Sequence, residues 1–254
     1  VVNSSTIVVT PTDAGIDNAV KSAMEVATEV IRKRIDEMGT REPTIQQQGS
    51  NRIVVQVPGL QDPKALKDLL GQTAKLEFKL VDIAADPSEV AQGRAPVGSE
   101  ILPYPGNPSG VPLIAVKRQV MVSGEELTDA TQSYDQQTNE PLVSIRFNGA
   151  GGRKFGQVTS QNVNRPFAII LDGTVLSAPN INEPILGGSA QISGSFTVES
   201  ANQLAIALRS GKLPVALAVV EERTVGPQLG ADSIRSGLIA SIIAVSAVAA
   251  FMFV

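Results

Sequence analysis

The residues best suited by type and spacing to do chemistry form a glycine-rich run followed by two cations, at residues 149–154. A phosphate-binding loop requires the spacing GxxxxGK[ST] or GxGxxG, because its backbone N–H groups must close around the phosphate. Here Lys154 stands at the third glycine position. After the Gly211-Lys212 pair, Leu213 stands where a Ser or Thr must coordinate magnesium. Neither run predicts a nucleotide site, and the first predicts a flexible loop that opens a helix.

Two adjacent acidic pairs are the next candidates, Glu125-Glu126 and Glu221-Glu222. Neighbouring side chains of a strand point to opposite faces, so the second pair is not expected to converge on one substrate. The first pair follows Ser123 and suits the first turn of a helix, where acidic side chains complement the helix dipole. Neither pair predicts an acid–base site.

The absence of two residue types limits the chemistry further. The chain contains no His and no Cys. The absence of His and Cys excludes Ser-His-Asp catalysis, a thiol nucleophile and a zinc–thiolate site within these residues. A Ser–Lys dyad stays open. We expect no catalytic, cofactor-binding or metal-binding residue and no cofactor, and so a protein that is not an enzyme, with a Ser–Lys peptidase of the cell envelope as an alternative.

Charge and aromatic content argue against a nucleic-acid partner. The net charge is −4, from 21 Lys and Arg against 25 Asp and Glu, and the basic residues are scattered. A nucleic-acid surface needs clustered Lys and Arg, and a base-stacking platform needs aromatic side chains, which make up only 4% of this chain. We expect no nucleic acid among the partners.

Residues 1–81 predict elements in the order β-α-β-β-α-β, the order of a ferredoxin-like domain. Strands are expected at residues 7–10, 43–46, 52–57 and 74–81. A helix begins at Pro63 behind Asp62 as N-cap and closes at Gly71. A longer helix begins at Thr12 or Asp13 and ends at Gly39, because apolar residues recur at spacings of three and four: Ile16, Val20, Met24, Ala27, Ile31, Ile35 and Met38.

Residues 82–112 are rich in Pro and Gly, which forbids a long helix or a central strand and predicts a linker or lid with one short helical piece near residues 88–91. A second α+β unit follows over residues 113–213. Helices are expected at residues 151–162 and 198–210, with Thr197 or Ser195 as a cap of the second. The Asp172-Gly173 pair predicts a tight hairpin turn. Strands are expected at residues 114–122, 142–147, 167–171, 175–178 and 190–193, and an apolar run predicts a further strand at 214–220.

The last nineteen residues, 236–254, carry no charge and are nearly all apolar. As a helix, a run of this length spans about 28 Å, close to the hydrocarbon thickness of a bilayer. It predicts the start of a transmembrane helix, with membrane lipid as its surroundings. A buried core helix or a disordered tail is the alternative. The end of the run at Val254, with no flanking anchor, is typical of a fragment of a longer membrane protein.

Several longer motifs are more specific than any of these patterns. LRSGKLPV at 208–215 and EERTVGPQLG at 221–230 lead into the apolar run, and RIDEMGTREP, QVPG, LDGTVLSAP and ISGSF begin at residues 34, 56, 171 and 192. In this order, and over essentially the whole chain, they resemble the SecD family of bacterial protein-export membrane subunits.

The resemblance implies a domain plan for an α+β chain. Residues 1–81 would form a ferredoxin-like base, 82–112 a linker and 113–213 a head domain. Residues 214–235 would return to the base as a strand and lead to the membrane, and 236–254 would begin the second transmembrane helix.

The resemblance also implies a function, an auxiliary role in the Sec protein translocase. The partners would be SecF, the SecYEG translocon and unfolded exporting polypeptides. Most of the chain would lie in the periplasm, anchored to the bacterial inner membrane. A proton gradient would drive conformational change through residues that lie outside this chain. The alternative is the periplasmic porter domain of a related proton-driven efflux transporter.

Overall fold

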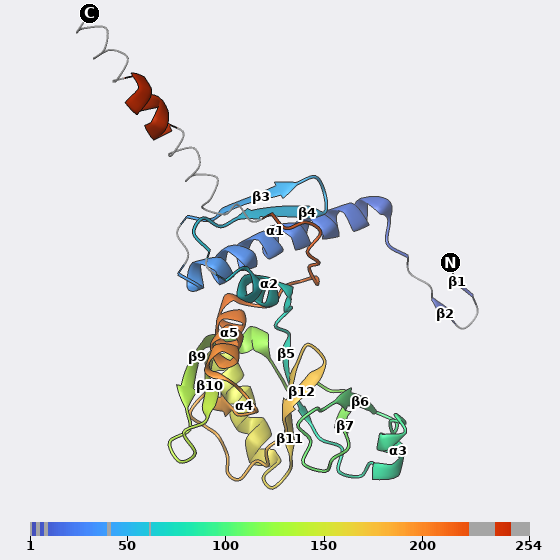
Figure 1. Cartoon of the computed structure of the whole chain (residues 1–254). Coiled ribbons are helices and arrows are strands. Elements are labelled where there is room, and N and C mark those ends of the chain that lie inside the picture. The colour runs from blue at the N-terminus through green and yellow to red at the C-terminus, as the bar shows by residue number, and fades with distance from the viewer. Residues whose placement is uncertain are drawn as a thin grey trace, which may run out of the picture. The chain divides into compact units, whose positions relative to one another are not determined.

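The computed structural model describes residues 2–3, 6–7, 10–39, 42–60, 62–223 and 237–244. Contacts divide the chain into two compact units, Val1–Leu217 and Ala218–Val254. In the first unit we call residues 10–71 the base and residues 76–210 the head. The base precedes the head in the sequence, and the head begins with the strand β5 (Figure 1).

The base is built on one long amphipathic helix, α1 (Asp13–Glu37). Thr12 caps it by accepting a hydrogen bond from the Gly15 N–H, and Gly39 follows its end in the left-handed conformation, as the sequence predicted. The hairpin of β3 (Thr44–Gln48) and β4 (Arg52–Gln56) and the helix α2 (Pro63–Gly71) pack on α1 (Figure 1). The buried side chains that join these elements are Ile31, Ile35 and Leu66.

The ferredoxin-like sheet expected for residues 1–81 is not formed by the described residues. β3 pairs with β4 in a two-stranded sheet, whereas β5 (Leu76–Leu80) pairs with strands of the head. At the N-terminus, β1 (Val2–Asn3) pairs with β2 (Thr6–Ile7), and Thr10 is not in a strand. The rest of the strand expected at 7–10 lies outside the described residues.

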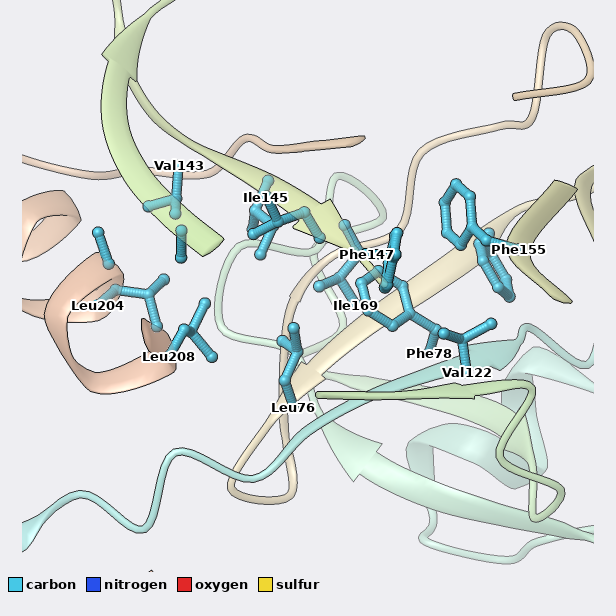
Figure 2. Packing of buried hydrophobic residues seen from close by; sticks show 14 of the residues in the cluster. Leu76, Phe78, Val122, Val143, Ile145, Phe147, Phe155, Ile169, Leu204 and Leu208 are labelled. Atoms are coloured by element: carbon cyan, nitrogen blue, oxygen red, sulfur yellow. The ribbon is translucent and has the colours of Figure 1, made fainter. Parts of the chain in front are cut away.

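The head contains two antiparallel sheets around one core. One has the order β12-β11-β5-β8 and the other β13-β10-β9. The strands are β8 (Val122–Ser123), β9 (Leu127–Tyr134), β10 (Pro141–Phe147), β11 (Phe167–Leu171), β12 (Thr174–Ser177) and β13 (Ser189–Ile192). A single turn, η1 (Gly124–Glu126), joins β8 to β9. The helices α4 (Gly149–Gln161) and α5 (Val198–Ser210) complete the head, and side chains of both enter the core (Figure 2).

The Pro/Gly-rich stretch is not a plain linker, which corrects the expectation for residues 82–112. The short helix expected near residues 88–91 is present as α3 (Pro87–Ala91), but the stretch also forms β6 (Ser99–Pro103), which pairs with β7 (Leu113–Lys117). This hairpin meets the four-stranded sheet through a second apolar cluster that includes Tyr104, Val116 and Ile170. The prolines are tolerated because β6 and β7 form a separate two-stranded ribbon, where few ladder hydrogen bonds are lost.

Two further expectations differ from the structure. The strand expected at 114–122 is broken into β7 and β8 by bends at residues 118–121. Residues 214–220 contain no strand. Leu213 and Leu217 instead pack against α1 and β4 through their side chains, so this apolar segment is buried at intervals without backbone pairing.

In the second unit the structure describes two stretches. Residues 237–244 are helical, and residues 218–223 contain neither helix nor strand. Within the described residues no helix combines the length and the hydropathy needed to cross a bilayer. Residues 236 and 245–254 of the expected transmembrane helix lie outside the described residues.

Candidate functional site

A cavity of ≈ 270 Å³ lies in the head, between its aromatic core and the segment that joins β12 to β13. Its floor is made by Phe78 of β5, Phe155 of α4, and Phe167 and Ile169 of β11. Alternation along β5 places Phe78 on the core face, and the helical stripe of α4 places Phe155 opposite it. The cavity therefore opens directly onto the head core.

The aromatic floor is packed in defined geometry (Figure 2). The Phe78 ring meets that of Phe155 edge to face at 5.7 Å, and the Phe147 ring stacks on Phe155 at 4.8 Å. Such pairs contribute about 0.5–1.5 kcal/mol each beyond the burial of their area. The floor is thus rigid and apolar, and the rings that form it are nearly fully buried, so only a small part of each faces the cavity.

The mouth of the cavity is polar. It is lined by Asn180, Asn182 and Glu183 of the connecting segment and by Gln191 of β13, all exposed. An apolar floor with a hydrogen-bonding rim suits an amphipathic ligand. The volume lies just below the range of about 300–1,000 Å³ typical of small-molecule sites, so the cavity fits one or two side chains of a polypeptide better than a cofactor.

The segment over the cavity, residues 178–188, has no helix or long strand and is held at a few points. Ile181 exchanges backbone hydrogen bonds with Asn164 and Arg165, at 2.8 and 3.0 Å. The Ile185 N–H donates to Thr159 Oγ1 at 3.0 Å. Between these points Asn182 and Glu183 are exposed. The Phe167 and Phe147 N–H groups also donate to the carbonyl oxygens of Pro179 and Gly188 at 2.9 Å, and Ile181 is buried in the head core, so this side of the cavity is fixed at several points around the exposed Asn182 and Glu183.

The glycine-rich run is the first turn of α4 and not the flexible loop that was predicted, although it does not form a nucleotide site. Asn148 caps α4, and its side chain accepts hydrogen bonds from the Ala150 and Gly151 N–H groups at 3.0 and 2.8 Å. Those are the donors that a phosphate would need. Gly151 is required for packing, because a Cβ there would lie 2.6 Å from the Cβ of Glu126.

Glu125, Glu126 and Glu221, from the two acidic pairs noted in the sequence, form hydrogen bonds and ion pairs that stabilise the fold locally. Glu126 closes a capping box at η1, accepting from the Ser123 N–H at 3.1 Å, and pairs with Lys154 at 3.3 Å. Glu125 forms an ion pair with Lys212. Glu221 pairs with Arg223 at 2.7 Å in an exposed position. The described parts of the chain contain no cluster of three His, Cys, Asp or Glu suited to a metal ion.

The structure does bring one serine and one lysine together, and their chemistry is not that of a peptidase. Lys117 Nζ lies 3.4 Å from Ser99 Oγ, but it also pairs with Asp82 at 2.8 Å. Ser99 is fully buried, and its hydroxyl donates to Asp82 at 2.5 Å. A general base must be neutral and its nucleophile must reach the substrate. Here the lysine is engaged by the Asp82 carboxylate and the serine is inaccessible.

A buried lysine, Lys79, lies between two carboxylates of β5 and β6, and the sequence did not predict this arrangement. Lys79 is buried and bonds Glu77 at 2.9 Å and Glu100 at 2.7 Å. Burial alone lowers the pKa of Lys79, but the two carboxylates outweigh it and raise the pKa above its usual value. Burial alone likewise raises the pKa of Glu77, yet hydrogen bonds from Lys75 and Lys79 bring it below its usual value. No sequence signal placed residue 100 beside β5.

Comparison with known proteins gives a consistent family. The model of the SecDF P1 head subdomain matches residues 99–215, and the model of the N-terminal P1 domain of protein translocase subunit SecDF matches residues 24–83. A relative from Rickettsia conorii named protein translocase subunit SecD is 43% identical over 99% of this chain and 48% of its own length. One of the same name from Magnetococcus marinus is 47% identical over 86% of this chain and 42% of its own length.

Solved structures agree. A crystal structure of SecDF in a super-membrane-facing form has a TM-score of 0.66 at 36% identity and covers 89% of this chain and 31% of that one. A structure described as a membrane component SecDF that enhances protein export has a TM-score of 0.62 at 36% identity, covering 86% of this chain and 96% of that one. This chain spans about half the length of the curated relatives it matches.

Proposed function

Because this chain belongs to the SecD family of protein translocase subunits, we propose that it serves protein export as the polypeptide-binding part of an auxiliary subunit of the Sec translocase. The head engages an exporting polypeptide, and a change of its position relative to the base helps late steps of export. SecF and the SecYEG translocon are the expected partners. The efflux-porter alternative finds no support in the names of the relatives described above.

The observation that carries this proposal is the amphipathic cavity of the head. An exporting polypeptide is unfolded and presents apolar side chains beside an unpaired, polar backbone. The aromatic floor of Phe78, Phe155 and Phe167 accepts the first, and the polar rim of Asn182 and Gln191 can hydrogen-bond the second. One or two side chains held in a shallow site give weak, reversible binding, which suits a subunit that must release each segment.

The same proposal places the chain at a membrane. The apolar run 236–254 begins a transmembrane helix that anchors the chain in the inner membrane, with residues 1–235 on the periplasmic side. The base is the ferredoxin-like domain nearest the membrane. These placements rest on the family and on hydropathy.

An export assay with a charged substitution at the cavity tests the proposal. Ile185 lines the cavity and is half-buried, so Ile185→Asp puts a carboxylate beside the aromatic floor, where an apolar side chain should bind. In cells that depend on the intact subunit, we expect precursor of an exported protein to accumulate. The matched control is Ile83→Asp, which changes an exposed aliphatic residue of another segment, 69% exposed, and should leave export unchanged. Normal export in both variants would contradict the proposal.

A further inference from the structure

Two short segments of chain connect the base to the head, and they are bonded to each other. Residues 72–75 run from α2 to β5, and residues 211–213 leave the end of α5. The Leu213 N–H donates to the Thr73 carbonyl oxygen at 2.8 Å. Any rotation of the head on the base must therefore pass through these two crossings.

Arg34 of α1 holds both crossings from the base side. It is fully buried, and its Nη1 donates to the carbonyl oxygens of Leu69 and Gln72 at 2.5 Å each, while Nη2 donates to that of Gly211 at 3.3 Å. Burial lowers the pKa of Arg34 to about 10, which leaves the guanidinium charged at neutral pH. A charge that lost these three carbonyl acceptors while it stayed buried would be left without partners or water, so breaking this contact is costly.

Asp172 holds one crossing from the head side. It lies at the exposed tip of the β11–β12 hairpin, and its carboxylate accepts hydrogen bonds from the N–H groups of Thr73, Ala74 and Lys75 at 3.1, 3.2 and 2.8 Å. The Thr73 hydroxyl donates to it as well, and the Asp172 N–H donates to the Lys75 carbonyl at 3.1 Å. Successive backbone N–H groups that converge on one carboxylate form an anion-binding nest.

The nest holds a backbone conformation that the chain does not favour by itself. Ala74 has φ = 56°, in the left-handed region, where the Cβ of any residue but glycine is crowded. Next to this turn a hollow of ≈ 390 Å³ is lined by residues of both crossings: Thr73, Lys75, Lys212, Leu213, Pro214, Val215 and Ala216. The crossing is thus constrained by Asp172 and has free space beside it.

We propose that Asp172 is a releasable latch that fixes the orientation of the head on the base, and that Arg34 is the pivot that keeps both crossings attached to α1 when the latch opens. A latch must open more easily than a pivot, and the two contacts differ in solvent exposure. The bonds of Asp172 to Thr73 and Lys75 are exposed and that to Ala74 is partly buried, so water can replace most of them at small net cost, whereas the bonds of Arg34 are buried or partly buried and none is exposed. This inference rests on the proposed function, because a latch has a role only if the head moves during export.

The test removes the latch and observes the crossing in the intact subunit in lipid nanodiscs. In Asp172→Ala, we expect hydrogen exchange at the amides of Thr73, Ala74 and Lys75 to accelerate by about tenfold or more, because their acceptor is lost. This chain contains no cysteine, so, with any cysteine elsewhere in the intact subunit replaced, spin labels can be placed through Ser22→Cys on α1 and Gln161→Cys on α4. The distance distribution between them should broaden relative to that of the labelled wild type.

Asp135→Ala is the matched control. The Asp135 carboxylate also accepts from two backbone N–H groups, those of Gln137 and Thr138 at 2.7 and 2.9 Å, but within the β9–β10 turn. In Asp135→Ala, hydrogen exchange should accelerate only at the amides of Gln137 and Thr138. Asp172→Asn keeps the shape of the side chain and loses the charge, so it should give a smaller change in the same direction, and it decides the matter if the alanine variant does not fold.

Unchanged exchange at Thr73 to Lys75, or an unchanged distance distribution, in the folded variant would overturn the latch. These readouts are independent of export. Faster exchange and a broader distribution with normal export would retain the latch and contradict the proposed role of head movement. Impaired export with unchanged exchange and unchanged distances would contradict the latch and leave the proposed function standing.

Discussion

The head and the base bury apolar surface in different ways. In the head, strands of two sheets and two helices share one continuous core with four phenylalanine rings in contact: Phe78, Phe147, Phe155 and Phe167 (Figure 2). In the base, two small clusters lie along α1, a third joins Leu69 of α2 to Ile206 and Ala207 of the head helix α5, and the sheet has two strands with no residue fully buried. An isolated hairpin is marginally stable by itself. The head is therefore a self-sufficient body, and the base depends on one helix.

The exposure of α1 supports the same contrast. Its apolar stripe is buried from Met24 onward, but Ile16 and Val20 of the same stripe are 46% and 38% exposed. The first turns of the helix thus extend beyond the elements that cover the rest. When a rigid head is joined to a less well covered base, we expect the two crossings, residues 72–75 and 211–213, to determine how the head moves on the base.

The largest effect should come from removing the centre of the head core. Phe78 is 1% exposed and contacts three other rings. Phe78→Ala should lower the free energy of unfolding by about 3–5 kcal/mol, through lost transfer energy and a cavity. The chain has no Trp, so urea unfolding is followed by far-ultraviolet circular dichroism. A cost below about 1 kcal/mol would show that the core is not continuous.

A matched change in the base should act more locally. Ile31 is 2% exposed and joins α1 to α2 and the β3–β4 hairpin. Ile31→Ala should cost about 2–4 kcal/mol. Hydrogen exchange should show faster opening of α1 and α2 while amides of β10 and β11 keep their protection. Equal loss of protection in β10 and β11 would contradict the independence of the head.

The ribbon of β6 and β7 offers a pH-dependent test of the second layer of the head. The Asp82 carboxylate is bonded by Lys117, Ser99 and the Ala84 N–H, and these contacts, that of Lys117 first, hold its pKa below the usual range. A folded-state pKa below the unfolded value of about 3.9 stabilises the fold above that pH, and the benefit is lost as the pH falls through the folded pKa.

Asp82→Asn should accordingly cost about 1–2 kcal/mol at neutral pH, since the partner lysine is partly exposed. Urea unfolding of both proteins across the acidic range should show the difference shrinking as the pH falls below about 4. A difference that does not change with pH would mean that the carboxylate charge does not tie the ribbon to the sheet.

The smallest effect belongs to the surface of the base. Lys33 pairs with Glu29 at 2.9 Å one turn away on α1, and both side chains are more than half exposed. Lys33→Ala should change the free energy of unfolding by about 0.5 kcal/mol or less. A loss above about 1 kcal/mol in the same urea titration would mean that exposed contacts carry more of the base than the buried face of α1 does.

Much of the local structure followed from the sequence because its signals are local. Thr12, Asp62 and Thr197 cap the helices as expected, and Asp172-Gly173 forms the β11–β12 turn. The alternation of residues 74–81 predicted β5. Strands β6 and β9 were missed, because prolines and polar residues such as those of LTDATQSY conceal a strand that is half exposed.

What the sequence did not reveal are contacts between distant residues. Residues 214–220 carry an apolar pattern typical of a strand, but only a partner edge can make them one. The buried pairing of Lys79 with Glu100 depends on the β6–β7 ribbon folding back onto the sheet. Asp172 could be recognised as a turn residue, whereas its bonds to residues 73–75 required the fold itself.

Site-specific photo-crosslinking tests the central claim, that the cavity of the head binds exporting polypeptide. A photo-reactive amino acid at Asn182, on the rim of the cavity, should crosslink to a secretory protein arrested during export. The same group at Gln137, exposed on the β9–β10 turn, serves as the control and should crosslink far less. Equal yields at Asn182 and Gln137, or no product at Asn182, would contradict the account.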